Sequence, residues 1–234
     1  MRPAFHPPVA VALDAPDVAT AEQWAAEIGP HVSVLKLGLE FYLSAGADGV
    51  LRVRRAAREC GLFLDLKLHD ITNTVAAATR VVAGLRPDFL TVHALGGPSM
   101  VAAAAEALPG TRITAVTILT SMSEADLAGV GIKGTPAEAV LRLAEMSVAA
   151  GAGALVCSPQ EVAAVRGAVG DEIVLITPGV RPPGAHRGDQ QRVATPAEAL
   201  SMGADLLVIG RPITGAHDRA EAASRVLTEG AQQG

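Results

Sequence analysis

The sequence is poor in aromatic residues and in cysteine. Phe, Tyr and Trp make up only 3% of the 234 residues, and the two cysteines, Cys60 and Cys157, stand far apart. Without a CxxC pair, two isolated cysteines argue against a disulfide framework and against a structural zinc site. We therefore expect two buried free thiols. The core must be aliphatic, because hydrophobic residues still form 50% of the chain and the mean hydropathy is +0.34.

The sequence also lacks a basic segment and a long apolar run. Its formal net charge is −5 and its isoelectric point is about 5.7, whereas nucleic-acid-binding proteins usually carry a basic footprint. The first residues contain an Arg but no apolar stretch of signal-peptide length. No run approaches the roughly 20 apolar residues that a transmembrane helix needs. These features predict a cytoplasmic protein with no nucleic-acid partner and no membrane partner.

Short aliphatic runs recur along the chain, and Ala-rich segments with helical periodicity lie between them. The runs cover residues 9–14, 32–38, 62–68, 89–94, 113–119, 154–158, 172–179 and 206–210. Helices are expected at residues 18–28, 49–61, 73–85, 98–108, 136–151 and 196–203. Strands that alternate with helices pair in parallel through right-handed crossovers. Eight such units predict an α/β fold, a (β/α)8 TIM barrel, with an open doubly wound sheet as the alternative.

No Pro- or Ser-rich linker and no change in composition divides the chain. Barrels of alternating strands and helices commonly reach this length as one unit. We therefore expect a single domain over residues 1–234.

The third aliphatic run carries charged residues where the pattern predicts a buried strand. Because side chains alternate along a strand, its four leucines are expected to face the helices, and Asp65 and Lys67 to face the barrel interior. The carboxyl ends of the strands are where barrel enzymes place their active sites. Buried charges need partners. A lysine among carboxylates is expected to keep its proton and can serve as a general acid. A structural salt bridge that fills the barrel is the alternative.

Polar residues also follow other strands at the same predicted rim. They are Asp14, Lys36, His93, Thr120, Ser121, Arg181, Gly210 and Arg211. We interpret Gly210 and Arg211 as a phosphate clamp, because phosphate sites in these barrels often use the loops after the last two strands. A glycine turn with a surface arginine is the alternative. His93 is interpreted as a hydrogen-bonded rim residue outside the site, and the role of His69 stays open.

The segment 181–192 is polar and rich in Pro and Gly, and it is long for a connection in a compact domain. Loops of this kind often act as lids or are disordered. Arg181 and Gln190 are expected to close over an anionic ligand, whereas Arg187 and Arg192 are interpreted as solvated charges.

Seven motifs resemble the orotidine 5′-phosphate decarboxylase family, and they follow one another along the chain in the order expected for that family. The resemblance covers essentially the whole chain, and DLKLHDITNT at residues 65–74 is similar to the family signature Asp-x-Lys-x-x-Asp. The other motifs are LDAPD, KLGLE, LTSM, PGVRP, GDQ and VIGRPIT. One small departure is Thr72, where the family usually has proline. The resemblance implies decarboxylation of orotidine 5′-monophosphate (OMP) to UMP, the last step of de novo pyrimidine nucleotide biosynthesis.

The resemblance also implies a role for each matching residue. The catalytic charges would be Lys36, Asp65, Lys67 and Asp70, and Lys67 would stabilise and protonate the carbanion. Asp70 and Thr74 would reach the neighbouring subunit's site, which implies a homodimer with shared active sites. The residues that contact substrate would be Asp14, Lys36, Asp65, Thr74, Thr120, Arg181, Gln190, Gly210 and Arg211. Ser121 and Ser123 are open alternatives to Thr120 at the pyrimidine. No metal and no cofactor is implied.

Two other functions are considered. A magnesium-dependent sugar-phosphate decarboxylase or aldolase of the same superfamily needs an acid on the second strand. Here Lys36 stands at that position and Glu40 lies beyond the strand. A non-catalytic nucleotide-binding barrel is the second alternative, but it would keep a costly array of buried charges without using it.

Overall fold

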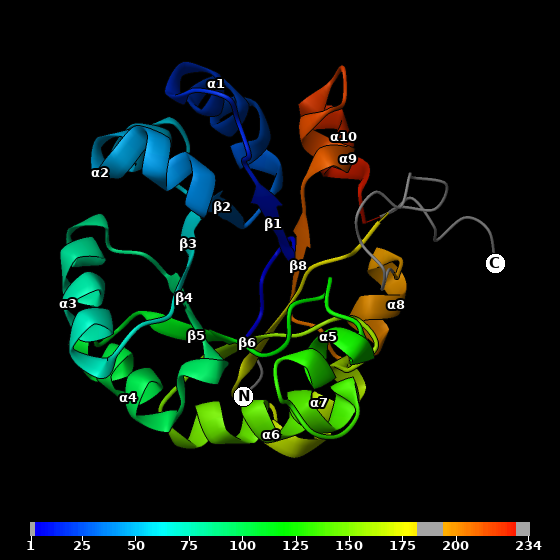
Figure 1. Ribbon diagram of the computed structural model, residues 1–234. Coiled ribbons are helices and arrows are strands. Elements are labelled where there is room, and N and C mark those ends of the chain that lie inside the picture. The colour runs from blue at the N-terminus through cyan, green and yellow to red at the C-terminus, as the bar shows by residue number, and fades with distance from the viewer. Residues whose placement is uncertain (1–2, 182–193, 228–234) are drawn as a thin grey trace.

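The structure, a computed structural model, describes residues 3–181 and 194–227 (Figure 1). Within these residues, strands pair in parallel and in sequence order to form one closed barrel, which helices surround. The strands are β1 (Val9–Ala12), β2 (Val34–Gly38), β3 (Gly61–Leu68), β4 (Phe89–His93), β5 (Arg112–Val116), β6 (Ala154–Val156), β7 (Val174–Thr177) and β8 (Leu206–Ile209). Because β1 pairs with both β2 and β8, the predicted (β/α)8 TIM barrel is confirmed and the open sheet is wrong.

The helices alternate with the strands around this barrel. They are α1 (Val18–Ile28), α2 (Leu39–Ala56), α3 (Thr72–Val82), α4 (Pro98–Ala107), α5 (Glu124–Gly129), α6 (Pro136–Ala149), α7 (Val162–Val169), α8 (Pro196–Ser201), α9 (Arg211–Thr214) and α10 (Arg219–Arg225). Short 3-10 turns are η1 (Gly29–His31), η2 (Ala83–Leu85) and η3 (Ala94–Gly96). Each of the eight aliphatic runs predicted as strands overlaps one of the strands, although β3 and β5 begin one residue before their runs.

Two helices begin with the same five residues, TPAEA, and in both the sequence explains the start. Thr135 caps α6 and Thr195 caps α8, and each hydroxyl accepts a hydrogen bond from the backbone N–H three residues later. The glutamate at that third position, Glu138 or Glu198, accepts in return from the backbone N–H of the threonine. This capping box satisfies N–H groups that a helix start leaves without partners, and proline fits the first helical position.

The helix predicted at residues 49–61 differs from the one observed. Helix α2 runs from Leu39 to Ala56, and Gly46 interrupts it with a non-helical backbone (φ 62°, ψ −165°). Gly46 and Gly49 are weak helix formers, which explains why the first half of α2 was not predicted from the sequence. The chain then turns back into β3, with the N–H of Cys60 donating to the carbonyl of Ala57 at 3.2 Å.

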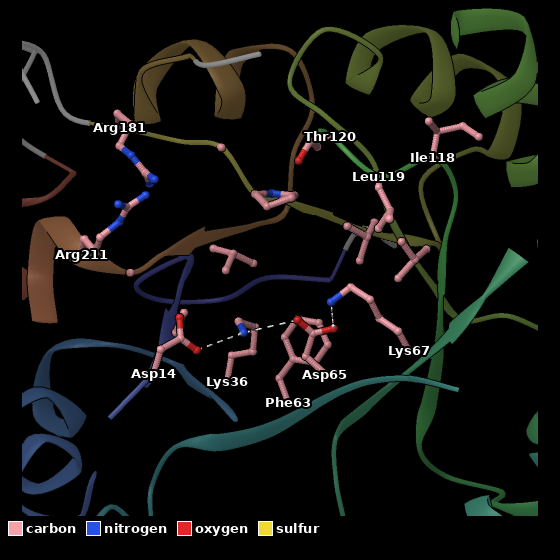
Figure 2. Close-up of a pocket in the computed structure, with 17 residues that line it drawn as sticks. Asp14, Lys36, Phe63, Asp65, Lys67, Ile118, Leu119, Thr120, Arg181 and Arg211 are labelled. Carbon is pink, nitrogen blue, oxygen red and sulfur yellow. Dashed lines mark hydrogen bonds and ion pairs between the residues drawn. The ribbon is translucent and has the colours of Figure 1, made fainter. Parts of the chain in front are cut away.

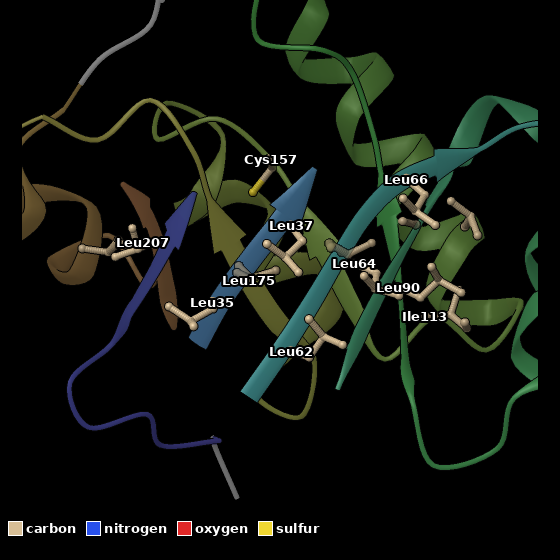
Figure 3. Close-up of a cluster of buried hydrophobic side chains, with 14 of the residues drawn as sticks. Leu35, Leu37, Leu62, Leu64, Leu66, Leu90, Ile113, Cys157, Leu175 and Leu207 are labelled. Carbon is tan, nitrogen blue, oxygen red and sulfur yellow. The ribbon is translucent and has the colours of Figure 1, made fainter. Parts of the chain in front are cut away.

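The hydrophobic core has two layers, one on each side of the sheet. Leu62, Leu64 and Leu66 belong to the outer layer between the strands and the helices (Figure 3), as the alternation predicts. The inner layer fills the barrel near the amino ends of the strands, where Phe63 and Phe89 pack edge to face at 5.7 Å. This apolar layer fills the barrel at the amino ends of the strands. Polar side chains can therefore occupy the carboxyl ends.

Both cysteines are buried free thiols, as predicted. Burial raises the pKa of the Cys60 thiol to about 11 and that of Cys157 to about 12. Across the part of the chain that the structure describes, no helix combines the length and the apolar character needed to cross a bilayer.

Candidate active site

A cavity of about 750 Å³ lies at the carboxyl ends of the barrel strands. Of the residues predicted for the site, its lining contains Asp14, Lys36, Asp65, Lys67, Thr120, Arg181, Gly210 and Arg211. These residues lie on or after six strands, β1, β2, β3, β5, β7 and β8, so the closed barrel is what brings them together. Residues that are up to 197 positions apart in the sequence (14 to 211) thus line one cavity.

Four of these residues form a row of alternating charge along one wall (Figure 2). The Lys36 ammonium nitrogen lies 3.9 Å from Oδ1 of Asp14 and 3.3 Å from Oδ2 of Asp65. The Lys67 nitrogen lies 2.7 Å from Oδ1 of Asp65. The side chains of Lys36 and Asp65 are only 11% and 14% exposed, whereas that of Lys67 is 39% exposed. Lys36 and Asp65 are therefore shielded from water, whereas the ammonium group of Lys67 faces the open cavity.

The two lysines determine the ionisation of Asp65. Burial alone would raise the pKa of this carboxyl group, but the ammonium groups of Lys36 and Lys67 outweigh the burial and hold the pKa below its ordinary value. Asp65 is therefore a carboxylate at neutral pH. The cavity wall thus presents a fixed negative charge between two positive ones.

The backbone that carries this row departs from a regular strand. Leu64 pairs with Leu90 and Leu68 pairs with Val92. Between these two pairs β3 advances by four residues, whereas β4 advances by only two. Within this bulge Lys67 has a φ of 49°, in the left-handed region that residues other than glycine rarely adopt. Side-chain alternation correctly predicts that Asp65 and Lys67 face the interior, but it does not predict the bulge. Bulges often occur beside active sites, where they redirect a side chain.

Two arginines lie at the other end of the cavity. Arg181 follows β7 and Arg211 begins α9 after Gly210, and their guanidinium groups point toward one another (Figure 2). Paired guanidinium groups suit an anion with several oxygens, such as phosphate. The structure brings the residues of the predicted clamp together beyond the last two strands, and their binding of phosphate stays a prediction.

The wall between these two ends comes from the segment after β5. Thr120 lies there beside the apolar side chains of Ile118 and Leu119 (Figure 2). Ser123 instead caps α5, because its hydroxyl accepts from the backbone N–H of Asp126. Of the hydroxyl residues left open by the sequence, Thr120 is therefore the one that lines the cavity. Ile118 and Leu119 were not predicted for the site, and only their place after a strand end distinguishes them from core residues.

Two predicted site residues do not line the cavity, and a third is not among the described residues. Asp70 and Thr74 are exposed at the start of α3, and the Asp70 carboxylate accepts a hydrogen bond from the N–H of Ile71 at 2.6 Å. Gln190 lies outside the described residues, as do Arg187, Arg192 and the rest of the proposed lid after Arg181.

His93 lies outside the cavity lining as predicted, at the end of β4. Its ring stacks on that of His69 at 5.3 Å. The prediction that it is hydrogen-bonded is wrong at Nδ1, which is buried and has no partner among the described residues. Burial lowers the pKa of His93, and the nearby His69 and Lys67 lower it further.

The positions of the His, Cys, Asp and Glu side chains also bear on whether a metal ion could bind. Among residues 3–181 and 194–227, no three or more His, Cys, Asp and Glu side chains are grouped so that they would hold a metal ion. The two carboxylates of the cavity wall, Asp14 and Asp65, are separated by the Lys36 ammonium group.

Comparison with known proteins agrees with this geometry. The chain matches the model of the orotidine 5′-phosphate decarboxylase / HUMPS family over residues 7–226. An orotidine 5′-phosphate decarboxylase of Thermobifida fusca is 64% identical over 222 residues, which are 95% of each chain. One from Frankia casuarinae is 50% identical over 96% of this chain and 88% of the relative.

Comparison of the fold with solved structures points to the same family. The crystal structure of orotidine 5′-phosphate decarboxylase from Lactobacillus acidophilus superposes with a TM-score of 0.83 and 36% sequence identity, covering 95% of this chain and 98% of that one. Because the agreement spans the sequence, the barrel and the charged cavity, the chain belongs to the orotidine 5′-phosphate decarboxylase / HUMPS family.

Proposed function

We propose that this protein decarboxylates OMP to UMP in its barrel cavity, and so performs the last step of de novo pyrimidine nucleotide synthesis. The observation that carries the proposal is the row Lys36–Asp65–Lys67, which lies across the cavity from an arginine pair. The relatives that support it are named for this activity and share up to 64% of their residues with this chain. A cavity of about 750 Å³ is also suited to a mononucleotide.

We propose one orientation for the substrate in this cavity. Its phosphate binds Arg181, Gly210 and Arg211, and the expected contact with Gln190 falls outside the described residues. The ribose hydroxyls contact Asp14 and Lys36. The pyrimidine then lies along the wall that contains Thr120, and its carboxylate points at Asp65 and Lys67. Phosphate is remote from the reacting carbon, so its binding energy can hold the substrate against the charged row.

The chemistry follows from the charges of the row. The substrate carboxylate lies near the Asp65 carboxylate, and the repulsion between them is relieved as CO2 leaves. The bond to CO2 breaks and leaves its electron pair on the pyrimidine carbon. The Lys67 ammonium stabilises this carbanion and donates a proton to it, which gives UMP and a neutral lysine that regains a proton from water. Lys36 and Asp65 hold this arrangement before substrate binds, so little reorganisation is needed during the reaction.

We propose that this chemistry needs no metal and no cofactor. The Lys36 nitrogen lies 3.9 Å from Asp14 and 3.3 Å from Asp65, and so fills the space between the carboxylates that would serve as ligands. Its positive charge repels a divalent cation there. This observation favours OMP decarboxylation over the magnesium-dependent sugar-phosphate reactions of the same superfamily.

We further propose a homodimer in which each subunit completes its neighbour's site. Asp70 and Thr74 are exposed outside their own subunit's cavity. Large apolar side chains follow three neighbouring strands at the same end of the barrel, with Leu39, Ile71 and Leu95 exposed by 51%, 72% and 40%. Apolar surface of this kind is typical of protein interfaces. A two-fold axis beside this surface would carry Asp70 and Thr74 into the partner's cavity.

The remaining expectations are part of the same proposal. Residues 1–234 form one catalytic domain, which acts in the cytoplasm without a nucleic-acid or membrane partner. The acidic net charge of −5 supports the absence of a nucleic-acid partner.

One experiment tests the proposed reaction. The purified protein is treated exhaustively with EDTA and incubated with OMP, and the ultraviolet absorbance change and the UMP formed are measured. UMP formation at the rate of the untreated protein is expected. Activity that disappears with EDTA and returns with Mg²⁺ would contradict metal-free chemistry, and absence of UMP under all conditions would contradict the function.

A further inference from the structure

One buried hydroxyl group contacts both catalytic residues of β3 without lining the cavity. Thr91 lies on β4 with its side chain directed into the barrel, and it is completely buried. Its Oγ1 lies 2.8 Å from the backbone nitrogen of Lys67 and 3.1 Å from Oδ1 of Asp65. Thr91 is not among the residues of the cavity wall, so it acts only through these neighbours.

The direction of each hydrogen bond is determined by the groups involved. The Lys67 N–H donates, so the Thr91 oxygen accepts there. The hydroxyl has one proton to donate, and two oxygens are within reach: Oδ1 of Asp65 at 3.1 Å and the carbonyl of Leu64 at 3.5 Å. The carboxylate is closer and charged, and hydrogen bonds to ionised acceptors are the stronger ones. Thr91 therefore donates to Asp65 while it accepts from Lys67.

These two bonds act at the point where the strand is irregular. The β3–β4 register shifts between Leu64 and Leu68, and Lys67 takes its left-handed backbone conformation inside that shift. A bulge leaves backbone groups without their ladder partners, and the Thr91 oxygen supplies the partner for the Lys67 N–H. A non-glycine residue with positive φ persists only where its surroundings hold it.

We propose that Thr91 is a positioning residue for the decarboxylation, because its single hydroxyl fixes the Lys67 backbone and the Asp65 carboxylate relative to each other. The inference rests on the proposed roles of these two residues. The hydroxyl holds Oδ1 of Asp65 where it accepts from the Lys67 nitrogen at 2.7 Å, and leaves Oδ2 for Lys36 at 3.3 Å. Without it, the bulge loses its internal partner and the ammonium group loses its fixed distance from the reacting carbon.

The test removes the hydroxyl and keeps the shape. Thr91→Val is expected to lower kcat by roughly 10- to 100-fold, because displacement of a catalytic group by about 1 Å has effects of this size. The dissociation constant of UMP should stay within about twofold, since the ligand contacts themselves remain. Thr91→Ser keeps the hydroxyl and should stay within about threefold of the wild-type kcat. If the valine variant does not fold, Thr91→Ala replaces it with the same expectation.

A matched control lies on the next strand. Thr114 is paired with Thr91 in the β4–β5 register, is equally buried, and bonds the carbonyl of Arg112 instead of a catalytic residue. Thr114→Val should leave kcat within about twofold of wild type, with melting temperature measured for every variant. This control separates loss of a buried hydroxyl from loss of the particular bonds that Thr91 makes.

The outcomes are distinct. A folded Thr91→Val protein with wild-type kcat overturns the inference, and so does a Thr91→Ser protein as slow as the valine variant. Equal losses in Thr91→Val and Thr114→Val also overturn it, because they indicate a general packing effect. Lys67→Ala, measured in parallel, tests the proposed mechanism separately: if Lys67→Ala is inactive and Thr91→Val is not, the mechanism stands and only the role of Thr91 is wrong.

Discussion

The ammonium nitrogen of Lys67 lies 2.7 Å from Oδ1 of Asp65, although the two residues are only two positions apart on β3. In a regular strand, side chains two apart run parallel. The bulge and the positive φ of Lys67 coincide with their convergence. Lys67 is therefore already paired in the absence of substrate, and in the proposed reaction the substrate carboxylate would approach a carboxylate that holds this lysine.

Replacing Lys67 by alanine should nearly abolish decarboxylation while UMP still binds. The substitution removes both the charge that faces the carbanion and the proton donor, so kcat should fall by several orders of magnitude. Steady-state kinetics and UMP titration measure the two effects. Lys133→Ala is the control, because Lys133 is exposed on the loop before α6. A loss of about tenfold or less would show that Lys67 has a structural role only.

The backbone of Lys67 gives a second prediction, about stability. With φ at 49°, this position favours glycine over any residue with a Cβ. Lys67→Gly should therefore be more stable than Lys67→Ala by about 1 kcal/mol, the reverse of the order expected in a regular strand. Urea unfolding of the two inactive variants measures the difference. An alanine variant at least as stable as the glycine variant would show that the position is not strained.

Removing Arg211 should weaken binding of a nucleotide more than that of a nucleoside. Arg211 lies at the end of the cavity opposite Lys67 (Figure 2), and only the nucleotide carries phosphate. Loss of a charge-assisted hydrogen bond should reduce UMP affinity by about 1.5–3 kcal/mol, with uridine affinity unchanged. Calorimetry with both ligands measures this, and Arg58→Ala, at an exposed arginine away from this cavity, is the control. Equal weakening for both ligands would place Arg211 away from the phosphate.

The proposed dimer predicts complementation between two inactive variants. Lys67→Ala and Asp70→Ala homodimers should each be nearly inactive. In a mixed dimer, one site has both lesions, while the other combines the lysine of one chain with the aspartate of the other and is intact. With equal mixing, half of the dimers are mixed and half of their sites work, so activity should recover to roughly a quarter of wild type.

Subunit exchange in that experiment is verified by native mass spectrometry. If exchange is complete and activity stays at the level of the single variants, Asp70 acts within its own chain and the shared site is wrong. Recovery without mixed dimers would instead point to contamination by wild-type protein.

The two thiols should be unreactive in the folded protein. Burial raises the pKa of Cys60 to about 11 and of Cys157 to about 12, so both remain protonated at pH values where an unfolded cysteine begins to ionise, near 8.5. The thiolate is the reactive form, and reaction with iodoacetamide at pH 8 should require unfolding. Mass spectrometry of native and urea-treated protein counts the labels, and rapid native labelling of either cysteine would contradict the burial described.

Much of the fold was predictable because the pattern is repeated. Eight aliphatic runs indicate the barrel even where single boundaries differ, and alternation in β3 orients Asp65 and Lys67 correctly. The start of α2 was not predictable, because Gly46 and Gly49 lie inside it and glycine is a weak helix former. The bulge was not predictable either, since a lysine with positive φ has no sequence signal of the kind that glycine or asparagine gives.

The candidate site also contains residues that could be predicted from the sequence and residues that could not. Charged residues after strand ends are conspicuous in a sequence, so Asp14, Lys36 and Arg211 were found. Thr91 was not, because a single threonine in a strand is also what β-propensity favours. Its proposed role depends on the irregular pairing of β4 with β3, which no local sequence pattern contains.

The ring of Phe63 has a consequence for inhibitor design. It lines the cavity and also packs on Phe89 in the apolar layer that fills the lower barrel. A ligand that extends toward this ring meets the close-packed interior and has no room to grow without displacing side chains that hold the barrel together. Affinity is therefore easier to gain by adding groups toward Thr120 and the arginine pair, which lie away from this packed interior. A substitution that made the protein resistant to such a ligand by replacing Phe63 with a smaller residue would also lower the thermal stability of the protein.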